Sequence, residues 1–295
     1  MSNSAESVIV VHVVGGLGNQ MFQYACGRAA ALRCGGQLLL DLSAFERYKL
    51  HRYGLDGFRI SAQKAPFRLQ TGSVLQASLR HLGLATRWQM KMQGFECIVE
   101  SKDLEIQKRM LEQHRRVYLE GYWQNEAYFA DVADLIRAEF QMRCPVIAPD
   151  AHEIADDLPL VSLHIRRGDY LHNPMANSVH GVLGLNYYHE SIKLMVQRIG
   201  ERFRIVVFSD DIEWARQNLS SRQPLSFVQG STVAPHDDLR MMASCDHHII
   251  ANSSFSWWGA WLNPSLTKVV ITPKRWFAAP ELAHRHICPS SWVRI

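Results

Sequence analysis

The sequence lacks the features that mark several common classes of protein. No segment of its 295 residues approaches the roughly 18 consecutive apolar residues of a membrane-spanning helix. It has no Lys/Arg-rich tract and no nucleic-acid-binding motif, and its net charge of +4 is spread along the chain. These absences predict a soluble globular protein that binds no nucleic acid. The mild positive charge suits a small anionic ligand.

The six cysteines form neither a CxxC pair nor a metal-ligand spacing. Four of them lie in apolar surroundings typical of helices or strands, which favours reduced, buried thiols and a cytoplasmic compartment. The N-terminus carries Glu6 where a secretory signal would have basic residues, and His12 interrupts its apolar run. We therefore interpret this run as a first strand.

The order of apolar patterns predicts an α/β protein. A β-branched run over 7–14 leads into a glycine turn, then a helical pattern stopped by Gly35-Gly36, then a strand over 37–41. Such a unit begins an open parallel sheet. Further strands are predicted over 117–123, 160–167, 203–211, 224–230, 247–252 and 268–273, and helices over 126–140, 187–200, 212–219, 237–246 and 253–263. The prolines in 144–150 indicate a hinge between two domains, and residues 45–116 show no clear pattern.

Two adjacent cations follow the apolar strand in SLHIRRGDYL, residues 162–171. Side chains alternate along a strand, so His164 and Arg166 lie on one side and Arg167 on the other. A guanidinium fits a pair of phosphate oxygens, and open parallel sheets bind ligands beyond the carboxyl ends of their strands. We predict that His164 and Arg166 contact different parts of one nucleotide. The alternative is a structural ion-pair network with Asp169 and other acids, and for Arg167 the two interpretations are equally open.

A second anion-binding feature is predicted in IIANSSFSWWGAWL, where a strand ending at Asn252 leads directly into a helix. The free backbone N–H groups, the helix dipole and the hydroxyls of Ser253 and Ser254 would all favour a phosphate. One of these serines could instead cap the helix, and both roles can hold at once. The tryptophans of this helix are expected in the core.

Three other groups of polar residues could have either a functional or a purely structural role. Asp238 could read a guanine edge, or Asp237 or Asp238 could be a helix N-cap. Residues 210–213 fit a capping box, which we favour over a catalytic role. His247 and His248 point to opposite faces of a strand, which disfavours a shared metal ion.

The loop GGLGNQMF partly matches a dinucleotide-binding fingerprint. Gly16 and Gly18 fill its first positions, but Met21 stands where Gly or Ala is required. Asp41 ends the next strand, where a ribose-binding acid would lie. An NAD(P)-dependent oxidoreductase is therefore an alternative, although it leaves Arg166 unexplained.

In this order, GGLGNQMFQYA, GYWQNEAYF, HIRRGDY, FSDD and IIANSSFSWWGAWL resemble the α-1,2-fucosyltransferases of glycosyltransferase family 11, bacterial type. The resemblance extends over about residues 8–276. It implies a GT-B-like α/β fold, with two Rossmann-like domains facing across a cleft. We expect an acceptor domain over 1–148, a GDP-fucose-binding domain over 149–275, and a tail over 276–295 that packs back on the first domain.

The resemblance also implies roles for individual residues. Arg166 matches the arginine that grips the β-phosphate of GDP, and His164 and Asp238 match residues that read guanine. Asn19 matches an asparagine that approaches the fucose and the acceptor. The remaining donor-binding residues implied by the matching motifs are Gly16, Gly18, Asn252, Ser253, Ser254, Phe255 and Ser256.

The implied reaction is inverting transfer of L-fucose from GDP-β-L-fucose to O2 of a terminal β-galactose, without a metal ion or other cofactor. Arg166 and the helix amides would stabilise the leaving GDP. No general base is evident, although Asp169 and Glu126 are candidates.

Unlike animal members, the sequence has no membrane anchor. We therefore expect a cytoplasmic bacterial enzyme at the inner face of the membrane, with at most peripheral membrane contact. Its acceptor would be a lipid-linked oligosaccharide of O-antigen or lipopolysaccharide synthesis. A non-catalytic nucleotide-sugar-binding protein is the other alternative, and it predicts GDP-fucose binding without turnover.

Overall fold

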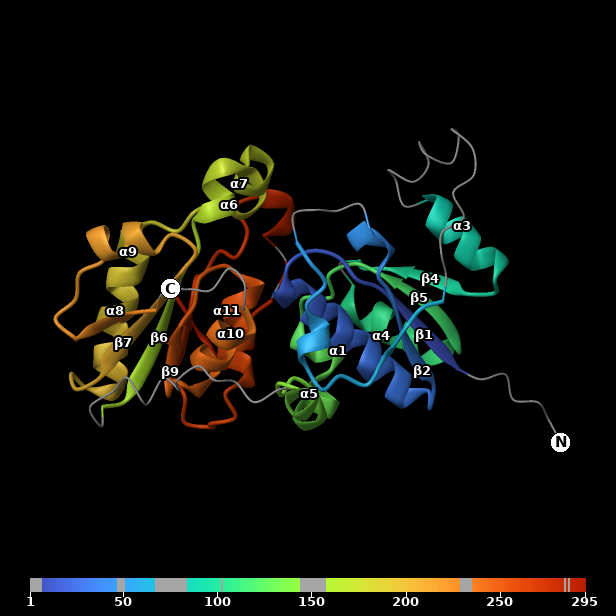
Figure 1. The fold of residues 1–295 in the computed structure, drawn as a ribbon, viewed down its shortest axis with the longest axis horizontal. Coiled ribbons are helices and arrows are strands. Elements are labelled where there is room, and N and C mark those ends of the chain that lie inside the picture. The colour runs from blue at the N-terminus through green and yellow to red at the C-terminus, as the bar shows by residue number, and fades with distance from the viewer. Residues whose placement is uncertain are drawn as a thin grey trace. The chain divides into compact units, whose positions relative to one another are not determined.

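In the computed structural model the chain forms two compact units, Met1–Arg143 and Cys144–Ile295, each built on its own parallel sheet (Figure 1). The structure describes residues 7–46, 51–66, 84–101, 103–143, 158–228, 235–283, 285 and 287–295. The predicted hinge at 144–150 lies outside these residues. No helix in the described part of the chain is long and apolar enough to cross a membrane. The predicted α/β class with two parallel-sheet domains is confirmed.

The N-terminal sheet reverses its strand order in the middle. Across the sheet, its described strands are β3 (Gln63–Lys64), β2 (Gln37–Asp41), β1 (Val8–His12), β5 (Arg116–Glu120) and β4 (Glu96–Val99). The described helices of this unit are α1 (Leu17–Arg33), α3 (Leu84–Met92), α4 (Leu104–Gln113) and α5 (Ala133–Glu139), with short 3-10 turns at Ser43–Glu46, Leu55–Gly57, Glu126–Tyr128 and Ala130–Val132. Because β1 and β5 are parallel neighbours, the loops that follow them emerge at the same edge.

Helix α1 lies close against the first two strands because residue 27 is glycine. A Cβ at Gly27 would lie 2.2 Å from Cγ2 of Val11 and 3.0 Å from Cδ1 of Leu38. Met21, which stands where the dinucleotide fingerprint requires glycine or alanine, is a fully buried core side chain instead. The close-packing glycine therefore lies further along the helix than the dinucleotide fingerprint would place it.

The C-terminal sheet has the complete doubly wound order. Across the sheet, its strands are β11 (Val293–Arg294), β10 (Val270–Thr272), β9 (His247–Ile249), β6 (Leu160–Ile165), β7 (Arg204–Ser209) and β8 (Leu225–Phe227), all parallel. Its described helices are α6 (Gly168–His172), α7 (Pro174–His180), α8 (Leu185–Ile199), α9 (Ile212–Asn218), α10 (Pro235–Ser244) and α11 (Ser254–Leu262), with a 3-10 turn at Pro280–Leu282. The order reverses between β6 and β9, which is the switch point where such folds bind ligands.

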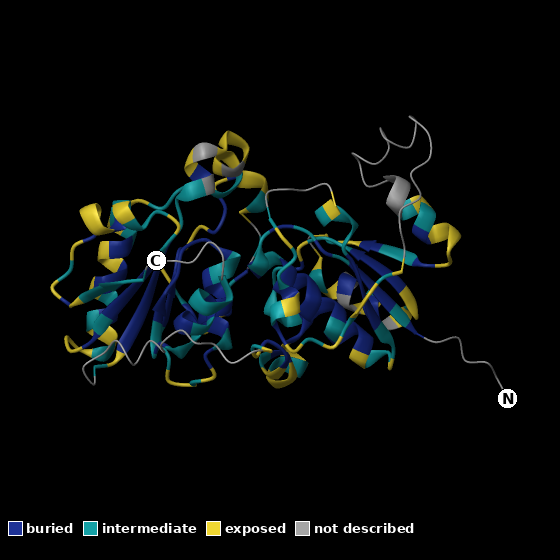
Figure 2. Ribbon diagram, viewed as in Figure 1, coloured by how far each residue is buried: buried dark blue, intermediate teal, exposed yellow. Residues whose placement is uncertain are grey.

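Alternating residues of β6 enter two separate cores. Val161, Leu163 and Ile165 pack with a cluster that includes Tyr188 of α8. Leu160 packs on the other face with α10 residues such as Met242. The sheet is therefore covered on both faces, and Figure 2 shows its strands largely buried.

Two predicted elements differ from the structure at β5 and just after it. The strand predicted over 117–123 ends at Glu120, because Gly121 (φ 151°) and Trp123 (φ 56°) turn the chain sharply. The helix predicted over 126–140 is instead two 3-10 turns followed by α5. The side chain of Asn125 accepts a hydrogen bond from Ala127 N, which favours the first of these turns.

The residues of the predicted tail, 276–295, contribute to the C-terminal sheet. Strand β11 pairs with β10, and Trp257 Nε1 donates to the carbonyl of Ile287 at 3.1 Å. Trp257 is fully buried and stacks on Trp261 at 5.9 Å, as expected of core tryptophans. None of the described cysteines forms a disulfide: Cys26, Cys34, Cys97, Cys245 and Cys288.

Candidate active site

The candidate site lies at the switch point of the C-terminal sheet. His164 is near the end of β6, Arg166 follows it, and the neighbouring strand β9 leads through Asn252 into α11. The rings of His164 and Phe255 are 6.0 Å apart, so the two predicted anion-binding segments meet.

His164 is buried, with 5% of its surface exposed, and its Nδ1 has no hydrogen-bond partner among the described residues. Burial, and then the nearby charge of Arg166, lowers the pKa of His164 to about 3. The imidazole is therefore neutral at physiological pH. A neutral ring with an unused nitrogen is suited to a hydrogen bond with an uncharged ligand group such as a nucleobase edge.

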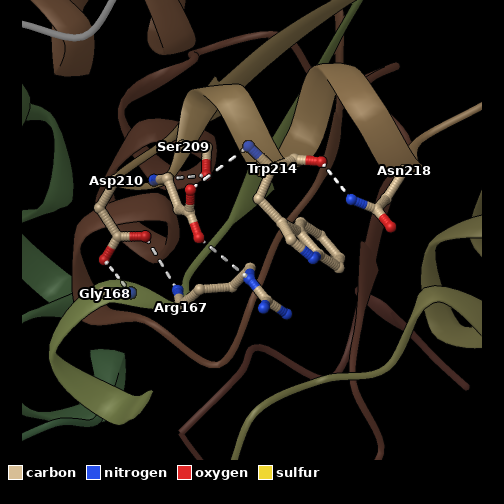
Figure 3. A network of polar contacts seen from close by, with 7 residues as sticks. Arg167, Gly168, Ser209, Asp210, Trp214 and Asn218 are labelled. Carbon is tan, nitrogen blue, oxygen red and sulfur yellow. Dashed lines mark hydrogen bonds and ion pairs between the residues drawn. The ribbon is translucent and has the colours of Figure 1, made fainter. Parts of the chain in front are cut away.

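Asp210 organises the turn that carries Arg166. One carboxylate oxygen of Asp210 accepts from Arg167 N at 2.8 Å, and the other accepts from Gly168 N at 3.0 Å (Figure 3). The second oxygen also lies 3.2 Å from the Arg166 guanidinium. A Cβ at Gly168 would lie 2.9 Å from that oxygen, so glycine permits this approach. The structure thus holds Arg166 in place at the strand end.

Arg167 has a structural role. Its guanidinium lies 3.5 Å from the centre of the Trp214 ring, and its Nε is 3.4 Å from Asp211 Oδ2. Asp211 is also the N-cap of α9, because its side chain accepts from Trp214 N (Figure 3). The predicted capping box over 210–213 is therefore wrong in register: the N-cap is Asp211, one residue later than the box requires, and Asp210 instead accepts hydrogen bonds from the turn after Arg166. The side chain of Asp169, the expected partner and candidate base, lies outside the part of the chain that the structure describes.

Ser253 and Ser256 belong to the turn that leads into α11, residues 253–256, here called the serine turn. The two side chains make different hydrogen bonds. Ser253 occupies the N-cap position of α11, but its side chain makes no capping hydrogen bond. Ser256 Oγ donates to the carbonyl of Ser253 at 3.2 Å, and this bond stabilises the turn. Asn252 Nδ2 donates to the carbonyl of His180 at 2.8 Å. The backbone N–H groups of the first turn of α11 lie next to the Ser253 hydroxyl in the arrangement by which helix N-termini bind anions, and anion binding here stays a prediction.

The acids of α10 do not cap that helix, since it begins at Pro235 and both lie within its first turn. Asp238 is half-buried there, and its guanine-reading role stays a prediction. Asp246, eight residues further on, accepts from Leu160 N at 2.7 Å and so fixes the start of β6.

The two adjacent histidines of β9 are bound within the protein. His248 Nδ1 is 2.8 Å from Ser162 Oγ, and its Nε2 is 2.9 Å from Asn263 Nδ2. His247 Nδ1 accepts from Val269 N. Among the residues that the structure describes, no three His, Cys, Asp or Glu side chains are grouped as metal ligands.

A second polar cluster lies at the switch point of the N-terminal sheet. Asn19, in the first turn of α1, accepts through Oδ1 from Gln124 Nε2 at 2.8 Å. Gln124 comes from the loop after β5, directly after Trp123 with its left-handed backbone. This bond orients the Asn19 amide and leaves its Nδ2 as a donor. Gly16 is the N-cap residue of α1, and Gly18 is buried in its first turn.

The other polar residues of this loop support its conformation. Gln20 Nε2 donates to the carbonyls of Gly15 and Arg52, and Gln23 Nε2 donates to the carbonyl of Gly121.

Asp41, the candidate ribose-binding acid, is buried and accepts from Tyr118 OH at 2.7 Å. Its carboxylate is thus already engaged within the protein, which argues against the oxidoreductase alternative.

Sequence reasoning missed Asp210 and Gln124 as partners of predicted site residues. Asp210 follows β7, the neighbour of β6, so adjacency of parallel strands is the signal that could have found it. Gln124 follows β5, the neighbour of β1, but the sequence does not show which strands are neighbours.

Two parallel-sheet units, one with an arginine and a helix N-terminus at its switch point, form an α/β architecture that suits a phosphorylated ligand. The model of glycosyl transferase family 11 matches residues 2–295. The chain therefore belongs to glycosyl transferase family 11, and it is a glycosyltransferase.

The relatives agree with this assignment, and a solved structure has a similar fold. The chain is 35% identical to an alpha-1,2-colitosyltransferase of Escherichia coli, over 98% of this chain and 99% of that protein. It is 32% identical to the O-antigen biosynthesis glycosyltransferase WbnK of E. coli, over 95% and 98%. It is 27% identical to galactoside alpha-(1,2)-fucosyltransferase 1 of Sus scrofa, over 84% and 63%. The fold is similar to NodZ alpha-1,6-fucosyltransferase, with a TM-score of 0.51 at 12% identity, over 88% and 93% of the two chains.

Proposed function

We propose that the chain is an inverting α-1,2-fucosyltransferase. It transfers L-fucose from GDP-β-L-fucose to O2 of a terminal β-galactose. The C1–oxygen bond of the donor breaks, its electron pair stays on the β-phosphate, and the acceptor oxygen bonds to C1 and loses its proton. The reaction needs no metal ion in this proposal.

The observation that carries the proposal is the arrangement around Arg166. Asp210 fixes its turn, and His164 contacts Phe255 of the serine turn. Donors held in this way can stabilise charge that develops on a leaving diphosphate without reorganising during the reaction. His164, with its free Nδ1, and Asp238 would then contact the guanine.

The N-terminal cluster would serve the sugar side of the reaction. Asn19, oriented by Gln124, would donate through Nδ2 to the fucose or the acceptor. Glu126, the other candidate base, lies in the first turn of the 3-10 helix that follows this loop. We leave the proton acceptor unassigned.

A second donor is favoured by one observation, the 35% identity to an alpha-1,2-colitosyltransferase. Colitose is 3-deoxy-L-fucose, so the two donors differ by one hydroxyl. A site that hydrogen-bonds this hydroxyl rejects the deoxy sugar strongly, whereas an apolar site discriminates only weakly. We favour fucose, and the test includes both donors.

The relative WbnK, named for O-antigen biosynthesis, supports an acceptor in that pathway. The acceptor would be a lipid-linked oligosaccharide at the cytoplasmic face of a bacterial membrane. A soluble β-galactoside such as lactose presents the same hydroxyl and can replace it in an assay.

The test is release of GDP from GDP-fucose and, separately, from GDP-colitose, with lactose present and EDTA added. We expect acceptor-dependent release with GDP-fucose that persists in EDTA and falls at least about tenfold in Arg166→Ala, as loss of a charge-assisted bond predicts. Arg167→Ala is the matched control, because its guanidinium stacks on Trp214, and it should retain most activity.

Three outcomes would contradict the proposal. Release only with GDP-colitose would make the chain a colitosyltransferase. Binding of GDP-fucose without release with any β-galactoside would favour the non-catalytic alternative. Full activity of Arg166→Ala would remove the role given to Arg166.

A further inference from the structure

Helix α3 exposes two large apolar side chains on one face. Trp88 is 65% exposed and Met92 is 69% exposed, and they stand four residues apart, so they are neighbours on the helix surface. Figure 2 shows this end of α3 largely exposed. Exposed tryptophan is uncommon in a globular protein, and two adjacent large apolar side chains indicate a contact surface.

The opposite side of α3 is anchored to the N-terminal sheet. Met90 is buried in a cluster with Phe95 and Tyr118. Arg87 donates to both carboxylate oxygens of Glu120, at 2.6 and 3.1 Å. The helix is thus fixed with Trp88 and Met92 directed outward, and their exposure does not reflect a loose helix.

The sequence that leads into and forms α3 is basic. Between Asp56 and Glu96 the sequence contains no Asp or Glu, and its Lys and Arg residues are Arg59, Lys64, Arg68, Arg80, Arg87 and Lys91. Lys91 is exposed next to Met92. Arg116, also exposed, lies over the Phe95 ring at 4.4 Å and donates to the carbonyl of Gln93 just beyond the helix.

We propose that the face formed by Trp88, Lys91 and Met92 docks on an anionic lipid bilayer. Trp88 and Met92 would enter the headgroup region, while Lys91 and Arg116 would bind lipid phosphates. Aromatic and apolar side chains flanked by lysine or arginine are typical of interfacial membrane binding. Two side chains are far too few for a stable protein interface of about 1,000 Å² or more, and lysine is depleted in such interfaces.

Docking here goes beyond the proposed function, because it can be measured without turnover. Its consequence would be local concentration of the enzyme at a surface that carries lipid-linked acceptors. Failure of the fucosyl-transfer assay on lactose and failure of vesicle binding are therefore separate results.

The test is co-sedimentation of the full chain with vesicles of phosphatidylcholine alone or of an equal mixture with phosphatidylglycerol. We expect binding to the mixed vesicles that weakens as salt rises, and weak binding to phosphatidylcholine alone. Trp88→Ser/Met92→Ser should reduce binding about tenfold or more, since the apolar insertion is lost. Lys91→Glu should reduce it as well.

Leu266→Ser is the matched control, because Leu266 is fully exposed in the other unit at 101% and has no role in the proposal. Affinity for GDP should be unchanged in all variants, which checks that they are folded. Absence of wild-type binding to the mixed vesicles, or equal binding by Trp88→Ser/Met92→Ser, overturns the proposal. A dimer that dissociates in the same double variant, without vesicle binding, would make this face an interface between copies and would also overturn it.

Discussion

The carboxylate of Asp210 lies 3.2 Å from the guanidinium of Arg166 and also accepts hydrogen bonds from the two backbone amides that follow this arginine. One side chain directly after β7 thereby sets both the position of Arg166, the predicted phosphate-binding residue, and the path of the turn that follows it. Catalysis by electrostatic stabilisation depends on such pre-organisation.

Asp210→Asn should weaken GDP binding and destabilise the protein. The amide NH2 would face a backbone N–H, so at least one hydrogen bond is lost, at a cost of about 1–3 kcal/mol. We expect about a tenfold loss of GDP affinity by calorimetry. Asp211→Asn is the control, because it affects the α9 cap and Arg167 but not Arg166. Equal loss of affinity in both variants would contradict the positioning role.

Substitution of Ser253 and substitution of Ser256 should have different effects on GDP affinity and on the free energy of unfolding. Ser253→Ala should weaken GDP binding several-fold with little change in the free energy of unfolding, because its hydroxyl makes no capping bond. Ser256→Ala should cost about 1 kcal/mol of stability and leave affinity unchanged, because its hydroxyl bonds the turn. Denaturant titration and calorimetry on both variants check this, and the reverse pattern would contradict it.

Gln124→Leu should lower kcat while leaving GDP affinity unchanged. The leucine cannot donate to Asn19 Oδ1, so the Asn19 amide is free to rotate away from its bound orientation. Displacement of a group at a reacting centre lowers rates by about tenfold or more. Gln113→Leu, an exposed glutamine at the end of α4, is the control. A fall in GDP affinity equal to the fall in kcat would argue against this role.

Acid should destabilise the protein through His164 and His248. Burial is the main cause that lowers the pKa of His164 to about 3 and holds that of His248 well below its ordinary value of 6.5. Below pH 6.5 the unfolded chain binds protons that the folded chain does not. The free energy of unfolding should therefore fall toward pH 4, by up to about 1.4 kcal/mol per pH unit for each histidine.

Urea titrations between pH 7.5 and 4 measure the slope of the free energy of unfolding against pH. In His164→Asn this slope should be smaller than in the wild type by the contribution of one histidine, up to about 1.4 kcal/mol per pH unit. This holds whatever the absolute stability of the variant. An unchanged slope would show that His164 takes up its proton in the folded state.

The sequence predicted the helices and strands of this fold better than it predicted which strands pair and which side chains meet across them. The strand pattern placed His164 and Arg166 correctly at the carboxyl end of a parallel strand, because strand period and apolar pattern are local properties. It assigned Arg167 no definite partner, since Asp211 and Trp214 approach only when β7 pairs with β6. The predicted helix over 126–140 is broken at Phe129 and Val132, whose backbone angles are not helical and are not encoded in the residue pattern.

Strand β11 has a consequence for the order in which the protein can fold during synthesis. The N-terminal sheet is complete once Glu120 has been made, so it can form while the second half is still being translated. The C-terminal sheet needs residues as far along the sequence as Ile295, because Ile295 N donates to the Thr272 carbonyl and Lys274 N donates to the Ile295 carbonyl. This edge of the sheet can close only after these residues have been made, so a chain that stops before Val293 would leave β10 unpaired on that side and open to association with other chains.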